Sequence, residues 1–108
     1  MDISEKQYKI VFTNDCIQEM DDIYNYISKK LYSSNSAKSL MKKIDDTIND
    51  LKIMPEKYFV IKKYDELNLE YRRIVVNKYI ILYTISEQNN TIYIVHMYYA
   101  GENYLDKI

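Results

Sequence analysis

EYRRIVVNKYIILYTI, residues 70–85, is the stretch that decides the fold. It sets two adjacent arginines before a run of β-branched and aromatic residues that only Asn77-Lys78 interrupts. Val, Ile and Tyr favour strands, and a two-residue break between such runs suits a tight hairpin turn. The stretch therefore predicts an antiparallel hairpin of strands 71–76 and 79–86.

Three more strands are expected around this hairpin. Residues 58–64 and 91–99 have strand composition, and residues 8–12 alternate well enough to form a first strand. The strands 79–86 and 91–99, joined by a turn at 87–90, are apolar on both faces. Strands of that kind are covered on both sides, so these two should be central in the sheet.

Two amphipathic helices are predicted between the first strand and the others, because apolar residues recur there at helical spacing. The recurring residues are Ile17, Met20, Tyr24, Ile27 and Leu31, then Ala37, Leu40, Met41, Ile44, Ile48 and Leu51. The first helix should span roughly 15–32, with Asn14 or Asp15 as its N-cap. One of the residues 33–36 should cap the second helix, and Pro55 should end it. Since the connection is short, the two helices should form an antiparallel hairpin.

The order of elements, β-α-α-β-β-β-β, predicts an α+β fold. An N-terminal strand and an antiparallel helical hairpin precede a four-stranded antiparallel meander, all in one sheet. A chain of 108 residues has the size of one domain, so residues 1–108 are expected to form a single domain. No apolar run reaches the roughly 18 residues that span a bilayer, and MDISEKQYK lacks the order of a signal peptide. With the lone Cys16, which suits a reducing compartment, this predicts a cytoplasmic protein without a membrane partner.

The charge balance is close to neutral, with a net charge of −1 and a pI of about 5.8. Proteins that bind nucleic-acid phosphates usually carry a clear basic excess, so any basic site must be local. Antiparallel packing of the two helices would bring five lysines to one tip: Lys29, Lys30, Lys38, Lys42 and Lys43. These lysines form either an ordinary solvated surface or a contact for an acidic partner.

The sequence lacks the residues that most kinds of catalytic site need. One His and one Cys make no metal site, and the single glycine, Gly101, makes no phosphate-binding loop. Cys16 lies on a helix with no predicted base beside it, so it is expected to be a small buried hydrophobe. No metal and no cofactor are therefore expected.

The candidates that remain for a site lie on neighbouring predicted strands, near the strand ends. They are Arg72, Arg73, Lys78, His96, Tyr98 and Tyr99. Strand alternation places His96 and Tyr98 on one face and Tyr99 on the other, and it puts the two guanidinium groups on opposite faces. One arginine is expected to pair with Glu70 or Asp65, and the other to remain on the open face for an anion or an acidic partner. His96 is either a core histidine or a catalytic one.

Four segments follow one another almost from end to end of the chain: YKIVFTNDC, LKIMPE, YRRIVVNKYIILYTI and IYIVHMYYAGENY. In this order and spacing they resemble the RelE/ParE toxins of bacterial type II toxin–antitoxin modules, some of which stabilise plasmids. The resemblance implies the fold described above, a growth-inhibiting activity and a cognate antitoxin that wraps the toxin and neutralises it.

The RelE-like branch of this superfamily cuts messenger RNA on the ribosome, with an arginine inside a Tyr-Arg-aliphatic-aliphatic-Tyr strand. The matching strand here is Tyr79–Tyr83, and Ile80 stands at the arginine position. The chemistry needs a base for the 2′-hydroxyl and cations for a charged phosphorane. The candidates for those roles here are Arg73, His96, Tyr98 and Tyr99.

The ParE-like branch inhibits DNA gyrase without a recognised hydrolytic site. Its pattern, a Tyr-Arg-Arg strand followed by a Tyr and then a His, is similar to Tyr71-Arg72-Arg73, Tyr83 and His96. The resemblance therefore favours a toxin whose partners are its antitoxin and a protein target such as gyrase. The residues expected to contact target or antitoxin are Arg72, Arg73, Lys78 and the five lysines of the helical hairpin. Two alternatives stay open: a ribosome-dependent messenger RNA endoribonuclease, and an inactive member that keeps only antitoxin binding.

Overall fold

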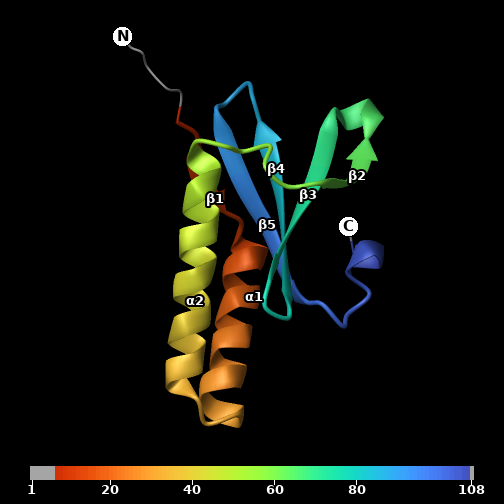
Figure 1. The fold of residues 1–108 in the computed structure, drawn as a ribbon. Helices are drawn as coiled ribbons and strands as arrows, with labels where there is room; N and C mark the ends of the chain where they lie inside the picture. The colour runs from red at the N-terminus through yellow and green to blue at the C-terminus, as the bar shows by residue number, and fades with distance from the viewer. Residues whose placement is uncertain (1–6, 108) are drawn as a thin grey trace.

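A five-stranded sheet and two long helices make up the computed structural model, which describes residues 7–107 (Figure 1). The elements are, in chain order, β1 (Lys9–Phe12), α1 (Asn14–Asn25), α2 (Ser34–Asn49), β2 (Val60–Tyr64), β3 (Leu69–Val76), β4 (Tyr79–Ser86) and β5 (Thr91–Tyr99). The strand order is β1-β5-β4-β3-β2; β1 runs parallel to β5, and the other pairs are antiparallel. The predicted α+β fold is confirmed.

The central hairpin forms where it is predicted. Val76 pairs with Tyr79 across the two-residue turn, in which Asn77 has a φ of 53°. Asparagine tolerates this left-handed region better than most residues, so the turn forms without glycine. β4 and β5 both lie inside the sheet, as predicted. Their register shifts between Leu82 and Tyr83, which leaves Val95 without a paired residue on β4.

The N-cap of α1 is Thr13, so the prediction of Asn14 or Asp15 is wrong. The Thr13 Oγ1 accepts a hydrogen bond from the backbone N–H of Cys16 at 3.1 Å. The same hydroxyl donates to the carbonyl oxygen of Val95 in β5, at 2.8 Å. This second bond, which local sequence cannot reveal, explains why Thr13 is the N-cap and α1 begins at Asn14.

The helical hairpin has irregular ends. α1 is followed by a π-helical turn at Tyr26–Lys30, so the first helical segment reaches nearly to the predicted residue 32. Tyr32 then has a φ of 51°, and α2 begins two residues later. A 3-10 turn at Asp50–Lys52 follows α2, so its regular part ends before Pro55.

The main core lies between the helices and one face of the sheet. Its buried residues include Ile27, Leu40, Ile44, Ile48, Leu51, Ile74, Ile81, Tyr83, Ile92, Ile94 and Met97. Cys16 is fully buried in this core, as expected, and burial raises the pKa of its thiol to about 12. Within residues 7–107, no helix is both long enough and apolar enough to cross a bilayer.

Candidate functional site

The sheet face turned away from the helices carries several candidate residues in two rows, which we call the open face. The rows are Arg73–Leu82–His96 and Val75–Ile80–Tyr98, each running from β3 across β4 to β5. Neighbouring strands lie about 4.8 Å apart, so about 10 Å separates the backbones of Arg73 and His96, with Leu82 between them. Ile80, Leu82 and Tyr98 are buried in a small apolar cluster. The centre of the open face is therefore apolar, and its polar groups stand at either side.

His96 is held by a carboxylate from the helical layer. Its Nδ1 lies 3.0 Å from Oε2 of Glu19 in α1, and its ring stacks on Tyr98 with 5.0 Å between ring centroids. Glu19 Oε1 also accepts the backbone N–H of Met97 at 2.9 Å. Burial, followed by the negative charge of Glu19, raises the pKa of Tyr98 to about 12, so this phenol stays protonated at neutral pH. Through these two contacts, the Glu19 carboxylate links α1 to β5.

Arg73 is the arginine on the open face. It is half-buried, and its Nη1 donates to the Tyr104 hydroxyl at 3.0 Å. Tyr104 also packs on the apolar cluster of Ile80 and Leu82. One arginine therefore lies on the open face, as expected, and a tyrosine from the C-terminal segment binds it. Its contact with a partner stays a prediction.

Arg72 points to the opposite face and holds the edge of the sheet. Its Nη1 donates to the carbonyl oxygens of Tyr58 at 2.7 Å and Glu56 at 3.3 Å. Its Nη2 lies 3.6 Å from the carboxylate of Glu70 and 3.7 Å from that of Glu56. The predicted pairing of one arginine with Glu70 is confirmed, and Arg72 is that arginine. It fastens the segment before β2 to β3.

Tyr99 does not join the open face. Strand alternation turns it the other way, where its ring lies 6.1 Å from the ring of Tyr79 in an edge-to-face arrangement. The structure thus brings Arg73, His96 and Tyr98 to one face and leaves Arg72 and Tyr99 outside it. It also adds two residues, Glu19 and Tyr104, that the sequence analysis did not single out.

The six candidate lysines are exposed. They are Lys29, Lys30, Lys38, Lys42 and Lys43 of the helical hairpin and Lys78 of the β3–β4 turn. Lys42 forms an ion pair with Asp46 at 3.1 Å. Lys43 donates to the side-chain oxygen of Asn77 at 3.0 Å, so the middle of α2 lies beside the β3–β4 turn.

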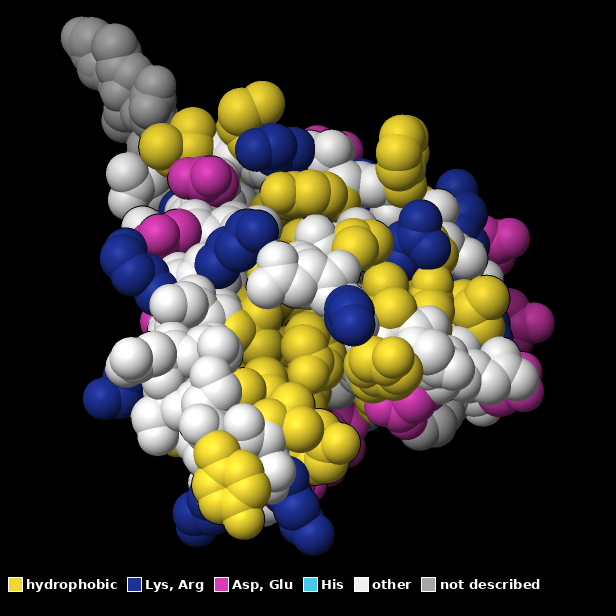
Figure 2. All heavy atoms as spheres, turned by 60° about the horizontal axis from the view of Figure 1, so that its bottom comes forward, with side chains coloured by type: hydrophobic (Ala, Val, Ile, Leu, Met, Phe, Trp, Pro, Cys, Tyr) yellow, Lys and Arg dark blue, Asp and Glu magenta, His cyan; other side chains and the backbone are white. Residues whose placement is uncertain are grey.

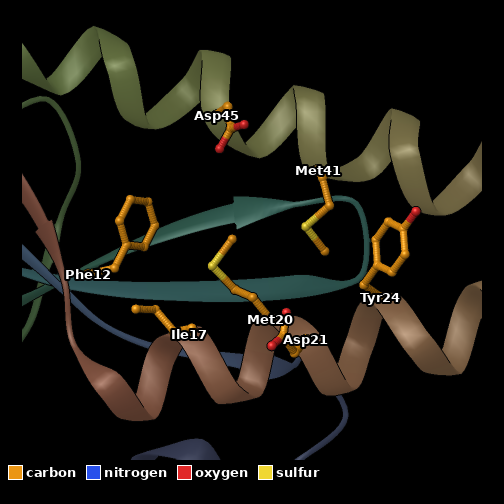
Figure 3. Close-up of a pocket in the computed structure, with 7 residues that line it drawn as sticks. All are labelled: Phe12, Ile17, Met20, Asp21, Tyr24, Met41 and Asp45. Carbon is orange, nitrogen blue, oxygen red and sulfur yellow. The ribbon is translucent and has the colours of Figure 1, made fainter.

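An apolar groove of about 350 Å³ opens between α1 and α2 (Figure 3). Its apolar lining consists of Phe12, Ile17, Met20, Tyr24 and Met41, and Asp21 and Asp45 stand at its borders. Ile17 is 48% exposed although it belongs to the apolar stripe of α1. Helical periodicity places Ile17 on the apolar stripe of α1, but it does not tell how closely a second helix covers that stripe.

No group of His, Cys, Asp or Glu within residues 7–107 is arranged to hold a metal ion.

Comparisons with known proteins show to which family the chain belongs. The sequence profile of the family described as ParE toxin of type II toxin-antitoxin system, parDE, matches residues 10–104. Comparison with curated protein sequences gave no significant match.

Three solved structures have the same fold. A chain of the chromosomal ParDE system from P. aeruginosa superimposes with a TM-score of 0.69 at 11% identity, over 87% of this chain and 97% of that one. A chain of the RelBE2 toxin–antitoxin complex from Mycobacterium tuberculosis gives 0.59 at 15% identity, over 94% and 100%. A chain of the archaeal RelE–RelB complex from Pyrococcus horikoshii OT3 gives 0.54 at 17% identity, over 89% and 98%.

The sequence resemblance to RelE/ParE toxins is thereby confirmed. Since the family profile covers most of the chain, the protein belongs to the ParE toxin family of type II toxin–antitoxin systems.

Proposed function

We propose that this toxin inhibits growth by binding a protein target, with DNA gyrase as the leading candidate, and that it does not cut RNA. The observation that carries the proposal is the apolar centre of the open face. Ile80, at 4% exposure, stands where the RelE-like resemblance expects an arginine, and Leu82 separates Arg73 from His96. RNA cleavage needs cations that converge on the developing phosphorane charge, and this arrangement keeps them apart.

The charged groups around that centre support the same proposal. Arg73 is bound to Tyr104, and His96 faces the Glu19 carboxylate rather than a second cation. A carboxylate beside the imidazole repels an approaching phosphate. The net charge of −1 adds no general attraction for nucleic acid.

The test measures two activities of the purified wild-type toxin side by side. We expect equimolar toxin to inhibit DNA supercoiling by gyrase, and we expect ribosome-bound message to stay intact under the same conditions. Cleavage of that message by catalytic amounts of toxin would falsify the proposal. If neither gyrase nor message is affected and induced expression is harmless, the chain is an inactive member that retains antitoxin binding.

A ribosome-dependent endoribonuclease is the second candidate, and one observation favours it. Glu19 orients the His96 imidazole, as a carboxylate orients a general base, and Tyr98 stacks beside the ring. This candidate predicts that His96→Ala and Arg73→Ala abolish growth inhibition although both variants stay folded. Our proposal predicts that both folded variants still inhibit growth, so induced expression of the two variants separates the mechanisms.

We also propose that the groove between α1 and α2 binds the cognate antitoxin through an apolar segment that carries Lys or Arg. The lining is apolar, and the carboxylates of Asp21 and Asp45 make no hydrogen bond or ion pair with any other residue in 7–107. Ile17→Glu should therefore reduce co-purification of the antitoxin. Ile53→Glu is the matched control, because Ile53 is similarly exposed and lies outside the groove. Equal retention of antitoxin by both variants contradicts this assignment.

A further inference from the structure

The β3–β4 turn lies beside α2, in the half of the molecule that holds the tip of the helical hairpin (Figure 1). Lys43, near the middle of α2, joins the helix to the turn through its 3.0 Å hydrogen bond to Asn77. A groove of about 340 Å³ lies between α2 and the turn. Its lining residues are Asn35, Ser36, Ser39, Leu40, Lys43 and Asn77. Five of these six side chains carry a hydroxyl, amide or ammonium group, and such groups donate hydrogen bonds to carboxylates.

Exposed tyrosines are also found on the helical hairpin and at the end of β5. Tyr26 and Tyr99 are each about half exposed, and Tyr32 is 92% exposed at the hairpin turn. The Tyr79 ring lies 6.1 Å from the ring of Tyr99, measured between centroids. Burial, followed by the phenols of Tyr99 and Tyr26, raises the pKa of Tyr79. The Tyr99 ring rests on Gly101, where an added Cβ would come within 2.5 Å of it. This end therefore offers apolar ring surface with polar tips, a combination that suits protein interfaces.

The lysines at this end are largely unpaired. The side chains of Lys29, Lys30, Lys38 and Lys78 make no hydrogen bond or ion pair with the other residues in 7–107, and the Lys43 ammonium group binds only the neutral Asn77. The first turn of α2 contains no acidic residue. Figure 2 looks onto this end: hydrophobic side chains line a hollowed stripe, and Lys or Arg side chains stand along its borders. The cations are therefore not neutralised by the protein's own carboxylates.

We infer that this end, the lysine–tyrosine surface, binds an acidic peptide segment of the toxin's target protein, with apolar side chains between its carboxylates. The surface consists of Lys29, Lys30, Lys38, Lys43, Lys78, Tyr26, Tyr32, Tyr79 and Tyr99. The inference rests on the proposed function only in assigning the segment to the target. The charge complementarity belongs to the surface itself.

A protein segment fits this surface better than a nucleic acid does. Bases bind to aromatic faces that lie parallel to them, whereas Tyr79 and Tyr99 meet at 69° and offer each other an edge. The net charge of −1 gives no long-range attraction for a polyanion. Further along α2, Asp45 and Asp46 would repel a phosphate backbone that extended beyond the lysines.

The test uses a short fluorescein-labelled peptide in which Glu and Leu alternate, and a control peptide in which Gln replaces Glu. We expect the toxin to bind the Glu peptide more tightly than the Gln peptide, with affinity that falls as salt rises. Lys43→Glu with Lys78→Glu should weaken binding about tenfold or more. The matched control, Lys9→Glu with Lys57→Glu, makes the same charge change away from the surface and should have little effect. Thermal melting of each variant confirms that it is folded.

Three results would overturn the inference: no binding of the Glu peptide to wild-type toxin, equal loss in both variant pairs, or preference for a single-stranded DNA oligonucleotide over the peptide. In cells, the Lys43/Lys78 variant should lose growth inhibition while it still co-purifies with the antitoxin. Loss of the antitoxin as well would assign the surface to the antitoxin and overturn the target assignment. If wild-type toxin binds the peptide but does not inhibit growth, the proposed function fails and the acidic-segment site stands.

Discussion

The carboxylate of Glu19 in α1 lies 3.0 Å from Nδ1 of His96 in β5, 77 residues later in the chain. β1 pairs with β5 only as far as Ile94, so beyond that residue this edge of β5 has no strand partner among residues 7–107. Glu19 occupies that edge and accepts the backbone N–H of Met97. One side chain thus joins the helical layer to the sheet where the strand pairing stops.

Glu19→Ala should lower the free energy of unfolding by about 1–3 kcal/mol, because it leaves the Met97 N–H and the His96 ring without their acceptor. Glu19→Gln keeps an acceptor oxygen and should cost less. Urea denaturation followed by circular dichroism measures both. Asp22→Ala is the control, since the Asp22 side chain is exposed and, within residues 7–107, bonds only to Gln18. A loss no larger for Glu19→Ala than for the control would show that this carboxylate is not a structural link.

Arg72→Ala should destabilise the toxin more than Arg73→Ala does. Arg72 binds two backbone carbonyl oxygens with a largely buried side chain, whereas Arg73 has a single bond to a tyrosine hydroxyl. We expect a loss of about 2–4 kcal/mol for Arg72→Ala and about 1 kcal/mol for Arg73→Ala. Arg72→Lys keeps the charge but not the planar fork, so it should recover only part of the loss. Equal unfolding midpoints for the two alanine variants would contradict this assignment of roles.

Tyr83→Phe should cost about 1–2 kcal/mol, because the fully buried Tyr83 hydroxyl donates to the Pro55 carbonyl oxygen at 2.6 Å. The bond ties β4 to the segment that leads from α2 to β2. Tyr93→Phe serves as the control, because Tyr93 in β5 makes no side-chain hydrogen bond with the other residues in 7–107. The unfolding midpoint of Tyr83→Phe should be clearly lower than that of Tyr93→Phe. Equal midpoints would contradict a stabilising role for the Tyr83 hydrogen bond.

Stability should fall as the pH rises above about 9. Burial raises the pKa of Cys16 from about 9 to about 12 and that of Tyr83 from about 10 to about 12. In this pH range the folded state holds these protons and the unfolded state releases them, so alkaline pH favours unfolding. The contribution is complete below pH 9 and is lost between pH 9 and 12. Urea denaturation of the wild type and of Tyr83→Phe across that pH range tests this. The urea midpoint of the variant should fall less than that of the wild type.

Local patterns were enough to predict the helical hairpin, the two central strands and the opposed guanidinium groups of Arg72 and Arg73. They did not tell which arginine faces the core, because that depends on the pairing of β3 with β4. Glu19 and Tyr104 were missed because their partners, His96 and Arg73, are far away in sequence. One signal for Glu19 was present: it follows the buried Cys16 by three residues, so it borders the apolar stripe of α1.

The groove between α1 and α2 was missed for a different reason. Ile17 and Met20 have the spacing of core residues, and the spacing says nothing about how far apart two helices stand. Whether an apolar stripe is buried in the core or lines an exposed groove depends on how the two helices pack. The amphipathic pattern of one helix does not reveal this.

The pairing of β1 with β5 also limits when the toxin can fold during its synthesis on the ribosome. Lys9 is among the first described residues to be synthesised, and its partner Thr91 is among the last. Closing so long a loop is slow, and the sheet cannot be completed until β5 has left the exit tunnel. Nascent chains therefore remain incompletely folded until β5 has been made and has left the tunnel. During that time the antitoxin can be made before the toxin fold is complete.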